Sequence, residues 1–564
     1  MGQPSESQTA AIAPDRPASR LASRSAVLAP LLLFLITFAV FSPVLRHHFI
    51  EGWDDSTAIL TNRDYNPPRL SKLGRYWVPP PTDTFYVPVT YTIWGLLAMV
   101  SRSSAPPGLP FNPAYFYAAN LVAHLLSVVM VFLILRRLVH QRWPAAAGAA
   151  MFALHPIQVE AVCNAWSLYS PLSGFFSFLA IWQYLIFADL RRSETGGRRA
   201  HGCVPLHYIF ATLAFLLALM TKPTAVSVPL MIVAIEFFLR KRRLIEWAIP
   251  LAPWVALGPV FVWLNLHAAP GGTVFVPDIT YRPLVPLDAI AFYLGKVFWP
   301  TGLVMDYGRS PIWLMEHPLA WLTAVVAPVA AWICWRLRRR FPWLAASFGV
   351  FVGGLLPTIG ILPFDFQHYS TVADRYAYPA MLGVAIAAAF VLRRWANRML
   401  VAGVIALLAL FTFLSVRQTR TWQDDWHVAA YTLETNPNSK AGISIFRYLF
   451  TRWGHFDPPD HPFPAYKLCS LDEPTLMRSA DFLRQKRFWD LAAGLYRNAI
   501  ARDSRNVAAY SGLGAALLQG QEYPDAQRAS REALRRDPDN ALARTTLDRL
   551  AAVEPRAAST APSN

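Results

Sequence analysis

Apolar stretches of about 17 to 25 residues recur along the chain from residue 26 to residue 416, and each is long enough to cross a bilayer as a helix. Segments rich in Arg, or in Pro, Gly and Asn, separate them. The pattern predicts an all-α membrane domain over residues 25–416. Its eleven predicted spans cover residues 26–45, 113–135, 144–160, 171–188, 206–222, 224–240, 246–266, 318–335, 342–362, 377–392 and 399–416.

Two further apolar stretches, residues 85–100 and 285–303, do not fit as spans. A crossing at either place would put the Arg clusters that follow, near Arg136 and Arg336, outside the membrane. Basic clusters at span ends normally mark cytoplasmic loops. We therefore predict that both stretches form interfacial or re-entrant helices.

The pattern changes after residue 416, where the chain becomes charged and helix-prone and contains an internal repeat. Six positions recur after 34 residues: Leu483, Ala492, Ala499, Ile500, Asp503 and Asn506 return as Leu517, Ala526, Ala533, Leu534, Asp537 and Asn540. This spacing is the period of tetratricopeptide repeats, which we predict over residues 483–552. Residues 417–482 are predicted to be a degenerate helical connector, and residues 1–24 and 553–564 polar, disordered tails.

Two clear repeats rarely stand alone, so the repeat domain is expected to pack on helices within residues 421–482 or on the membrane domain. The repeats could form a passive cap. Alternatively, they could present a concave surface that binds a peptide partner. The sequence leaves both possibilities open.

Composition supports a membrane protein and excludes a soluble enzyme, since 54% of the 564 residues are apolar and only 15% are charged. The net charge of +17 does not indicate a nucleic-acid partner, because the Arg clusters lie at span ends. We predict a cytoplasmic N-terminus, a first span that acts as a signal anchor, and an extracytoplasmic repeat domain. The Arg-rich composition is typical of a bacterial protein, which would place the chain in the inner membrane.

The four cysteines lie at different predicted depths, which indicates neither a disulfide framework nor a zinc site. They are Cys163, Cys203, Cys334 and Cys469.

Candidate chemistry lies in the outer loops. The first loop, residues 47–66, carries the adjacent acids Asp54 and Asp55. One such carboxylate could be a general base, and the other a ligand for a metal or a substrate hydroxyl. Most acidic pairs in loops are instead solvated side chains or turn formers, and a pair alone does not decide between these alternatives.

Four more outer segments place polar groups next to apolar spans: H-P-I-Q-V-E at 155–160, L-M-T-K-P at 219–223, Y-L-G-K-V-F-W-P at 293–300 and V-A-D-R-Y at 372–376. Lys222, Lys296 and Arg375 are predicted on the same side as the acidic pair. Cations gathered there could bind a phosphate. The alternative is that these segments are ordinary helix ends with interfacial anchors, such as Trp299 and Tyr376.

Taken in order, these motifs resemble the multi-spanning glycosyltransferases with C-terminal tetratricopeptide repeats. This family includes the transmembrane and tetratricopeptide-repeat O-mannosyltransferases of eukaryotes and their bacterial relatives. The resemblance covers about residues 25–545 and implies a GT-C membrane fold. It also implies transfer of a sugar from a polyprenyl-phosphate carrier, with inversion of the anomeric carbon, to a protein hydroxyl or an envelope glycan or lipid.

The resemblance also implies roles for individual residues. Asp54 or Asp55 would be the base, and Lys222, Arg375 and, third, Lys296 would bind the donor phosphate. A substrate pocket would be formed by His155, Glu160, Asp374 and Tyr376, with Asp374 orienting Arg375. No cofactor or tightly bound metal is predicted, although the resemblance leaves a divalent ion open because GT-C enzymes include both metal-dependent and metal-independent members. His47 and His48 lie near the acidic pair, but adjacent histidines on a loop seldom bind one ion.

The chain departs from the family pattern at two positions. Relatives commonly carry an Arg and, two residues on, an Asp where this chain has Leu168 and Ser170. An alternative is therefore a catalytically inactive, membrane-anchored scaffold whose repeats hold protein partners. A transporter is less favoured, because the predicted spans contain few ionisable residues.

Overall fold

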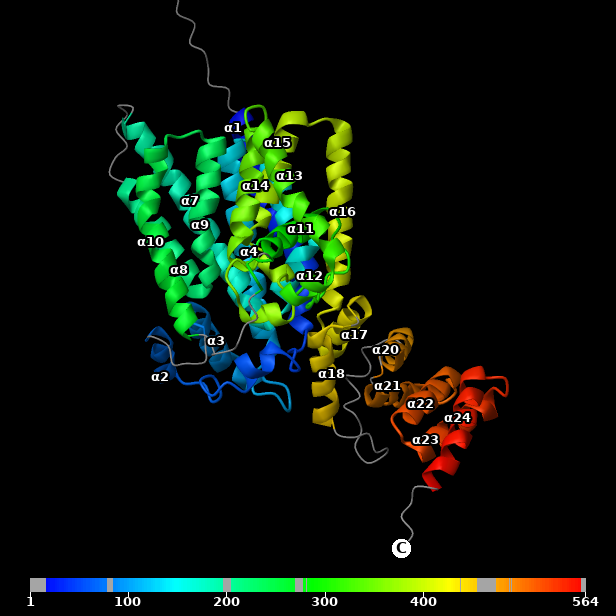
Figure 1. Ribbon diagram of the computed structural model, residues 1–564. Coiled ribbons are helices and arrows are strands. Elements are labelled where there is room, and N and C mark those ends of the chain that lie inside the picture. The colour runs from blue at the N-terminus through cyan, green and yellow to red at the C-terminus, as the bar shows by residue number, and fades with distance from the viewer. Residues whose placement is uncertain are drawn as a thin grey trace, which may run out of the picture.

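The computed structural model describes residues 17–78, 85–195, 204–268, 277–279, 281–436, 438–453, 473–485, 487 and 489–558. All regular elements within these ranges are helical, which confirms the all-α prediction. Long helices run side by side in one bundle, and a group of shorter helices, α17 to α24, lies beyond one of its ends (Figure 1). Cys163 and Cys334 are buried free thiols, whereas Cys203 and Cys469 lie outside the described residues.

Seven helices in the described part of the chain are long and apolar enough to cross a membrane. They are α1 (Pro17–Phe41) with η1 (Ser42–Arg46), α4 (Pro113–Val139), α7 (Tyr169–Thr195), α8 (Val204–Thr221), α10 (Leu244–Ala268), η9 (Pro318–Val325) with α13 (Val326–Leu337), and α16 (Arg398–Arg420). Helix α1 begins inside the segment that the sequence predicts as a polar tail. Helices α4 and α7 are mostly buried, whereas α10, α13 and α16 expose most of their apolar surface, as expected of helices that face lipid.

An eighth candidate span is broken. Helix α5 (Arg142–Leu154) is followed by η5 (Pro156–Gln158) and α6 (Val159–Cys163), and the chain bends by 52° between them. The bend follows from Pro156, because a residue before proline is disfavoured in the helical conformation and His155 is extended (φ −68°, ψ 130°). As a result, Glu160 lies on a short helix separate from α5.

The other three predicted spans are helical but shorter. They are Pro223–Leu239 (η7, Pro223–Ser227; α9, Val228–Ala234; η8, Ile235–Leu239), Pro342–Thr358 (α14, Pro342–Leu355; η10, Leu356–Thr358) and α15 (Met381–Trp395). By length and composition, seven or eight of the described helices qualify as membrane spans, and the remaining predicted spans are shorter helices of the same bundle. Prolines that start two of these helices, and basic residues that end α15, limit their apolar length.

Both stretches predicted not to cross are short helices. Helix α3 (Pro88–Ser101) has 14 residues and α11 (Leu284–Phe298) has 15. At 1.5 Å per residue, neither is long enough to span a hydrocarbon core of about 30 Å. Helix α3 lies at the lower end of the bundle, near α2 (Leu70–Leu73), in Figure 1.

The two ends of the bundle differ in charge. Helix α1 starts at the upper end in Figure 1, and the basic connection between α15 and α16 lies there too. Ion pairs join the basic ends of other helices: Asp189 of α7 contacts Arg137 of α4 at 2.8 Å and Arg242 at 3.0 Å. The buried Glu236 of η8 contacts Arg240 at 2.9 Å. The opposite end carries the outer loops and the C-terminal helices.

The C-terminal helices repeat at the predicted interval. Helices α20 (Glu473–Gln485), α22 (Val507–Gln519) and α24 (Ala541–Ala558) start 34 residues apart, as do α21 (Trp489–Arg502) and α23 (Tyr523–Arg536). The first repeat helix thus begins ahead of residue 483. Helices α17 (Asp425–Thr435) and α18 (Lys440–Trp453) form a hairpin that contacts α20 and α21, so the repeats pack on helices within residues 421–482, as expected.

Candidate active site

The acidic pair lies in the loop after η1, and its two members have different surroundings. Asp55 is buried and accepts two backbone hydrogen bonds, from Ile50 N at 2.8 Å and from Trp166 N at 2.9 Å. It therefore ties the first outer loop to η6 (Ala165–Leu168). Asp54 remains partly accessible. Burial raises the pKa of Asp54 to about 6, although the positive charge of Arg375 opposes the shift.

Arg375 is held by a second carboxylate, that of Glu160. The backbone N–H of Arg375 donates to Glu160 Oε2 at 2.9 Å, and its guanidinium pairs with Glu160 Oε1. Both side chains are almost fully buried, and the guanidinium lies over the rings of Phe366 (4.4 Å) and Tyr376 (5.0 Å). Burial alone would lower the pKa of Arg375, but Glu160 raises it above its usual value. Arg375 is thus a permanent, rigidly oriented cation.

The Nε atom of Arg375 is buried and has no hydrogen-bond partner among the described residues. A buried donor without a partner is costly, and guanidinium groups commonly bind carboxylates and phosphates through such N–H groups. This atom is therefore a donor that a ligand could use.

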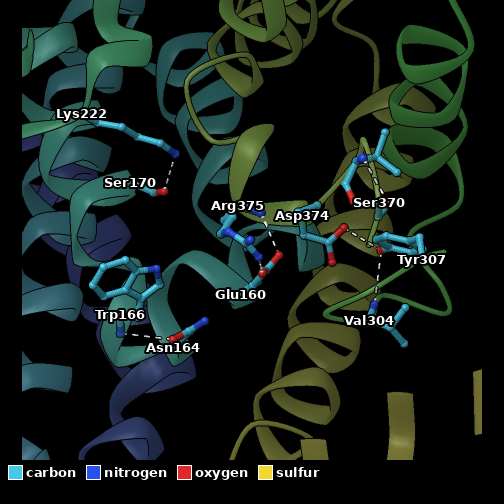
Figure 2. A network of polar contacts seen from close by, with 12 residues as sticks. Glu160, Asn164, Trp166, Ser170, Lys222, Val304, Tyr307, Ser370, Asp374 and Arg375 are labelled. Carbon is cyan, nitrogen blue, oxygen red and sulfur yellow. Dashed lines mark hydrogen bonds and ion pairs between the residues drawn. The ribbon is translucent and has the colours of Figure 1, made fainter. Parts of the chain in front are cut away.

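Lys222 supplies a second cation, just beyond the end of α8. Its ammonium group donates to Ser170 Oγ at 2.9 Å (Figure 2). It also lies over the rings of Tyr169 (4.7 Å) and Tyr376 (5.3 Å). Burial lowers the pKa of Lys222 to about 7; the charge of Arg375 adds to this shift and that of Glu160 opposes it. Ser170, one of the two departures from the family pattern, is therefore the hydrogen-bond partner of Lys222.

A small pocket with room for about one water molecule adjoins Lys222, and seven of its twelve lining residues carry a hydroxyl group. The residues that line it are Ser170, Ser173, Gly174, Ser177, Lys222, Thr224, Ala225, Ser227, Gly354, Thr358, Tyr376 and Pro379. Such a surface can donate and accept hydrogen bonds beside a positive charge, which suits a polar or anionic ligand.

Asp374 and Lys296 lie on the other side of Arg375. Asp374 accepts a hydrogen bond from the Tyr307 hydroxyl at 2.7 Å, so the partner of Arg375 is Glu160 and not Asp374 (Figure 2). Lys296 donates to the backbone carbonyls of Thr301 at 2.7 Å and Gly302 at 3.1 Å. These bonds make it a support for the turn after α11.

His155 has a different environment from the other predicted site residues. Its Nε2 lies 3.1 Å from the carbonyl of Val297, and its Nδ1 accepts from Ile157 N at 3.2 Å. The ring also packs edge-on against Phe411. Both ring nitrogens are thus engaged in holding the bend between α5 and α6.

The structure adds residues that the sequence patterns do not single out. The Tyr293 hydroxyl bonds both the N–H and the carbonyl of Ala373 at 3.0 Å and so fixes the loop that carries Arg375. Tyr293 belongs to the Y-L-G-K motif, but Tyr307 and Phe366 lie outside every motif. Only their contacts reveal them.

In the described ranges, no three His, Cys, Asp or Glu side chains are grouped closely enough to hold a metal ion. The site combines a partly accessible acid, Asp54, with two basic side chains, Arg375 and Lys222. The charge of Arg375 acts on both Asp54 and Lys222.

Comparisons with known proteins agree with the motifs over part of the chain. No family model matches it. Protein O-mannosyl-transferase Tmtc2 of Drosophila melanogaster is 30% identical over 133 residues, which are 23% of this chain and 14% of that protein. Protein O-mannosyl-transferase Tmtc1 of the same organism is 29% identical over 132 residues, 23% of this chain and 15% of that protein. The match thus covers about a seventh of each relative.

A solved structure, the apo oligosaccharyltransferase of Archaeoglobus fulgidus, aligns with 78% of this chain and 61% of its own at 13% identity, with a TM-score of 0.37. A superposition this loose does not establish a shared fold. The sequence matches confirm the resemblance that the motifs indicate: over part of its length, the chain is similar to the transmembrane and tetratricopeptide-repeat O-mannosyltransferases.

Proposed function

We propose that the chain is a membrane glycosyltransferase of the GT-C type. In this proposal it transfers a sugar from a polyprenyl phosphate to a hydroxyl of a protein or envelope acceptor, with inversion of the anomeric carbon. The partial similarity to the O-mannosyltransferases supports the class of enzyme, and the charges of the site support the reaction.

The observation that carries the proposal is that the charge of Arg375 acts both on Asp54 and on Lys222, which links the acid and the two basic side chains in one site. With a pKa of about 6, Asp54 is mostly ionised at neutral pH and still basic enough to accept a proton. The acceptor oxygen would form a bond to the anomeric carbon while its proton moves to Asp54. The bond from that carbon to the phosphate oxygen would break, and its electron pair would leave with the phosphate.

Arg375 and Lys222 would stabilise the charge that develops on the leaving phosphate. Arg375 offers its unpartnered Nε, and Lys222 offers an ammonium group beside the hydroxyl-lined pocket. Glu160 would orient Arg375, and Asp55 would hold the first loop. In this proposal Lys296 supports a turn and does not contact the phosphate.

The direction of the chain in the membrane is part of the proposal. The basic clusters at one end of the bundle would face the cytoplasm of a bacterial inner membrane. The first outer loop, Arg375 and the repeats would then face the extracytoplasmic side. An acceptor bound to the repeats would lie on the same side as the site.

The test is transfer of labelled sugar from a panel of polyprenyl-phosphate donors by the purified protein, with membrane extract as the acceptor. We expect turnover of at least one donor and a loss of about 10²–10⁴-fold in Asp54→Asn, because the base is removed. Asp55→Asn should mainly lower the thermal midpoint, because it disturbs an acceptor of two buried amides.

A scaffold without activity remains the second candidate, favoured by Leu168 and Ser170 where relatives carry charged residues. For such a scaffold we expect no sugar transfer from any donor. Silence of the folded protein across donors that are shown to be competent would favour the scaffold and contradict the proposed reaction.

A further inference from the structure

The hairpin of α17 and α18, which carries the repeat domain, is hydrogen-bonded to the outer loops that form the site. Its strongest link is to the first loop, immediately before the acidic pair. Asp425 Oδ1 accepts from Gly52 N at 2.8 Å, and Asp425 Oδ2 accepts from Glu51 N at 3.2 Å. The hydroxyl of Tyr448 in α18 donates to Glu51 Oε2 at 3.0 Å.

The hairpin also approaches this loop closely through its backbone. A Cβ atom on Gly52 would lie 2.9 Å from the Cα of Ile445 and 3.2 Å from Asp425 Oδ1. Asp425 itself is 2% exposed, and Glu51 is 5% exposed. The contact is therefore dry and tightly packed, which makes a buried carboxylate with two amide donors well defined in position.

A second link reaches the loop between α11 and α12 (Pro311–Glu316). The Ser439 hydroxyl donates to Asp306 Oδ2 at 2.9 Å, Ala441 N donates to the same oxygen at 3.3 Å, and Asn436 Nδ2 donates to the Asp306 carbonyl at 2.9 Å. The next residue, Tyr307, bonds Asp374 beside Arg375. The hairpin thus contacts segments on both sides of the site.

We infer that Asp425 is a positioning residue for the transfer reaction: it fixes the backbone of the first outer loop so that Asp54 stays where the charge of Arg375 acts on it. The inference rests on the proposed function. It makes the hairpin part of the transferase unit, although the sequence groups it with the soluble C-terminal region. Since α17 contacts α20 and α18 contacts α21, the repeats are attached directly to the element that holds the acidic loop.

The inference separates the effects on turnover and on donor binding. Arg375 lies on η12 (Asp374–Tyr376) and Lys222 follows α8, whereas the carboxylate of Asp425 accepts from the backbone of the first outer loop. Loss of the Asp425 carboxylate should therefore displace Asp54 and leave the phosphate-binding cations in place. A displacement of about 1 Å can cost about 10²-fold in rate.

The experiment compares Asp425→Ala with Glu434→Gln in the full-length protein. Glu434 lies on the same helix, but its carboxylate faces Arg478 of the repeats at 3.8 Å. Hydrogen exchange of the peptide covering residues 48–56 reports the loop without requiring activity. We expect exchange at least about tenfold faster in Asp425→Ala only, because two amides lose their acceptor.

In the transfer assay, kcat should fall by about 10²-fold in Asp425→Ala while KM for the donor stays within about twofold. The acidic limb of the pH profile should also move to lower pH, since a displaced Asp54 becomes better hydrated. Asp425→Asn, which keeps one acceptor oxygen, should retain more activity. Tyr448→Phe provides a milder change if Asp425→Ala folds poorly, and it should shift exchange in the same direction.

Unchanged exchange in Asp425→Ala would overturn the inference, as would faster exchange with an unchanged kcat and pH profile. If the wild-type protein transfers no sugar from any donor, the proposed function fails separately. In that case, exchange in Asp425→Ala that is no faster than in the wild-type protein would still overturn the inference that this carboxylate positions the loop.

Discussion

Two adjacent aspartates in one loop have different tasks because their surroundings differ. Asp55 accepts two backbone hydrogen bonds and holds the loop, whereas Asp54 is partly accessible and faces the field of Arg375. The two cations also have different partners: Glu160 orients Arg375, whereas Ser170 accepts a hydrogen bond from Lys222. Because Ser170 is neutral, its hydrogen bond does not compensate the charge of Lys222.

Activity should depend on pH through Asp54. The base must be ionised, and burial raises its pKa to about 6, so kcat should fall as the pH drops through about 6. The residual rate of Asp54→Asn should lack this limb. The measurement is the pH dependence of kcat at saturating donor. An acidic limb near pH 4, as for a solvated Asp, would contradict the assignment.

Two lysines near the site should respond differently to substitution. Lys222→Met should raise KM for the donor by about tenfold or more, because a cation at the phosphate is lost. Since burial lowers the pKa of Lys222 to about 7, donor affinity of the wild-type protein should weaken as the pH rises through about 7.

Lys296→Met should instead lower the thermal midpoint, because two backbone carbonyls lose their donor. A larger change of donor KM in Lys296→Met would reverse these roles.

At the scale of elements, close helix contacts and one broken helix position the site. The bend at Pro156 puts Glu160 on α6, which contacts η12, where its carboxylate meets the backbone and side chain of Arg375. A straight continuation of α5 would carry Glu160 elsewhere along the bundle. Tyr293 of α11 then fixes the preceding loop residue, Ala373. The polar groups come from helix ends and breaks, because an unbroken helix satisfies its own backbone.

Helix packing predicts different effects for two glycines. In α15, a Cβ on Gly383 would meet the carbonyl of Ser347 and lie 2.8 Å from Phe351 N of α14. Gly383→Ala should therefore separate these helices and destabilise the protein by about 1–3 kcal/mol. A Cβ on Gly403 of α16 meets nothing within 4 Å, so Gly403→Ala is the matched control and should not destabilise the protein. Thermal unfolding in detergent measures both, and equal midpoints would contradict the packing argument.

At the scale of the whole molecule, the chain has a basic end and an end that carries the site, the hairpin and the repeats (Figure 1). Between these ends, exposed apolar side chains cover the helices at the periphery of the bundle. This apolar zone fits the hydrocarbon core of a membrane, which would separate the two ends. The hairpin contacts the outer loops directly and also contacts α20 and α21, so the described repeat helices are connected to the site through packed helices.

This arrangement predicts the accessibility of tags on the full-length protein in spheroplasts. A tag after residue 564 should be removed by protease added from outside, whereas a tag before residue 1 should be protected until the membrane is opened. The immunoblot pattern before and after detergent gives the answer. Protection of the C-terminal tag in intact spheroplasts would reverse the proposed orientation.

The amino-acid sequence by itself determines the helical class, the approximate place of the membrane helices and the 34-residue repeat, because these depend on local hydrophobic spacing. It also places Asp54, Lys222 and Arg375 at helix ends on one side. It does not give the length of each membrane helix, since apolar runs do not show where prolines and close turns shorten a helix.

Only the tertiary structure decides which of these groups meet. Glu160 and Arg375 are 215 residues apart in the chain, and Asp425 is 373 residues from Gly52, yet each pair shares a hydrogen bond. His155, which shares a motif with Glu160, supports a bend, and Tyr307, which belongs to no motif, bonds Asp374. Spacing along one helix or loop is local. A buried charge is stable only next to a partner of opposite charge or a hydrogen-bonding group. Which residues form such pairs therefore depends on how elements that are distant in the sequence pack together.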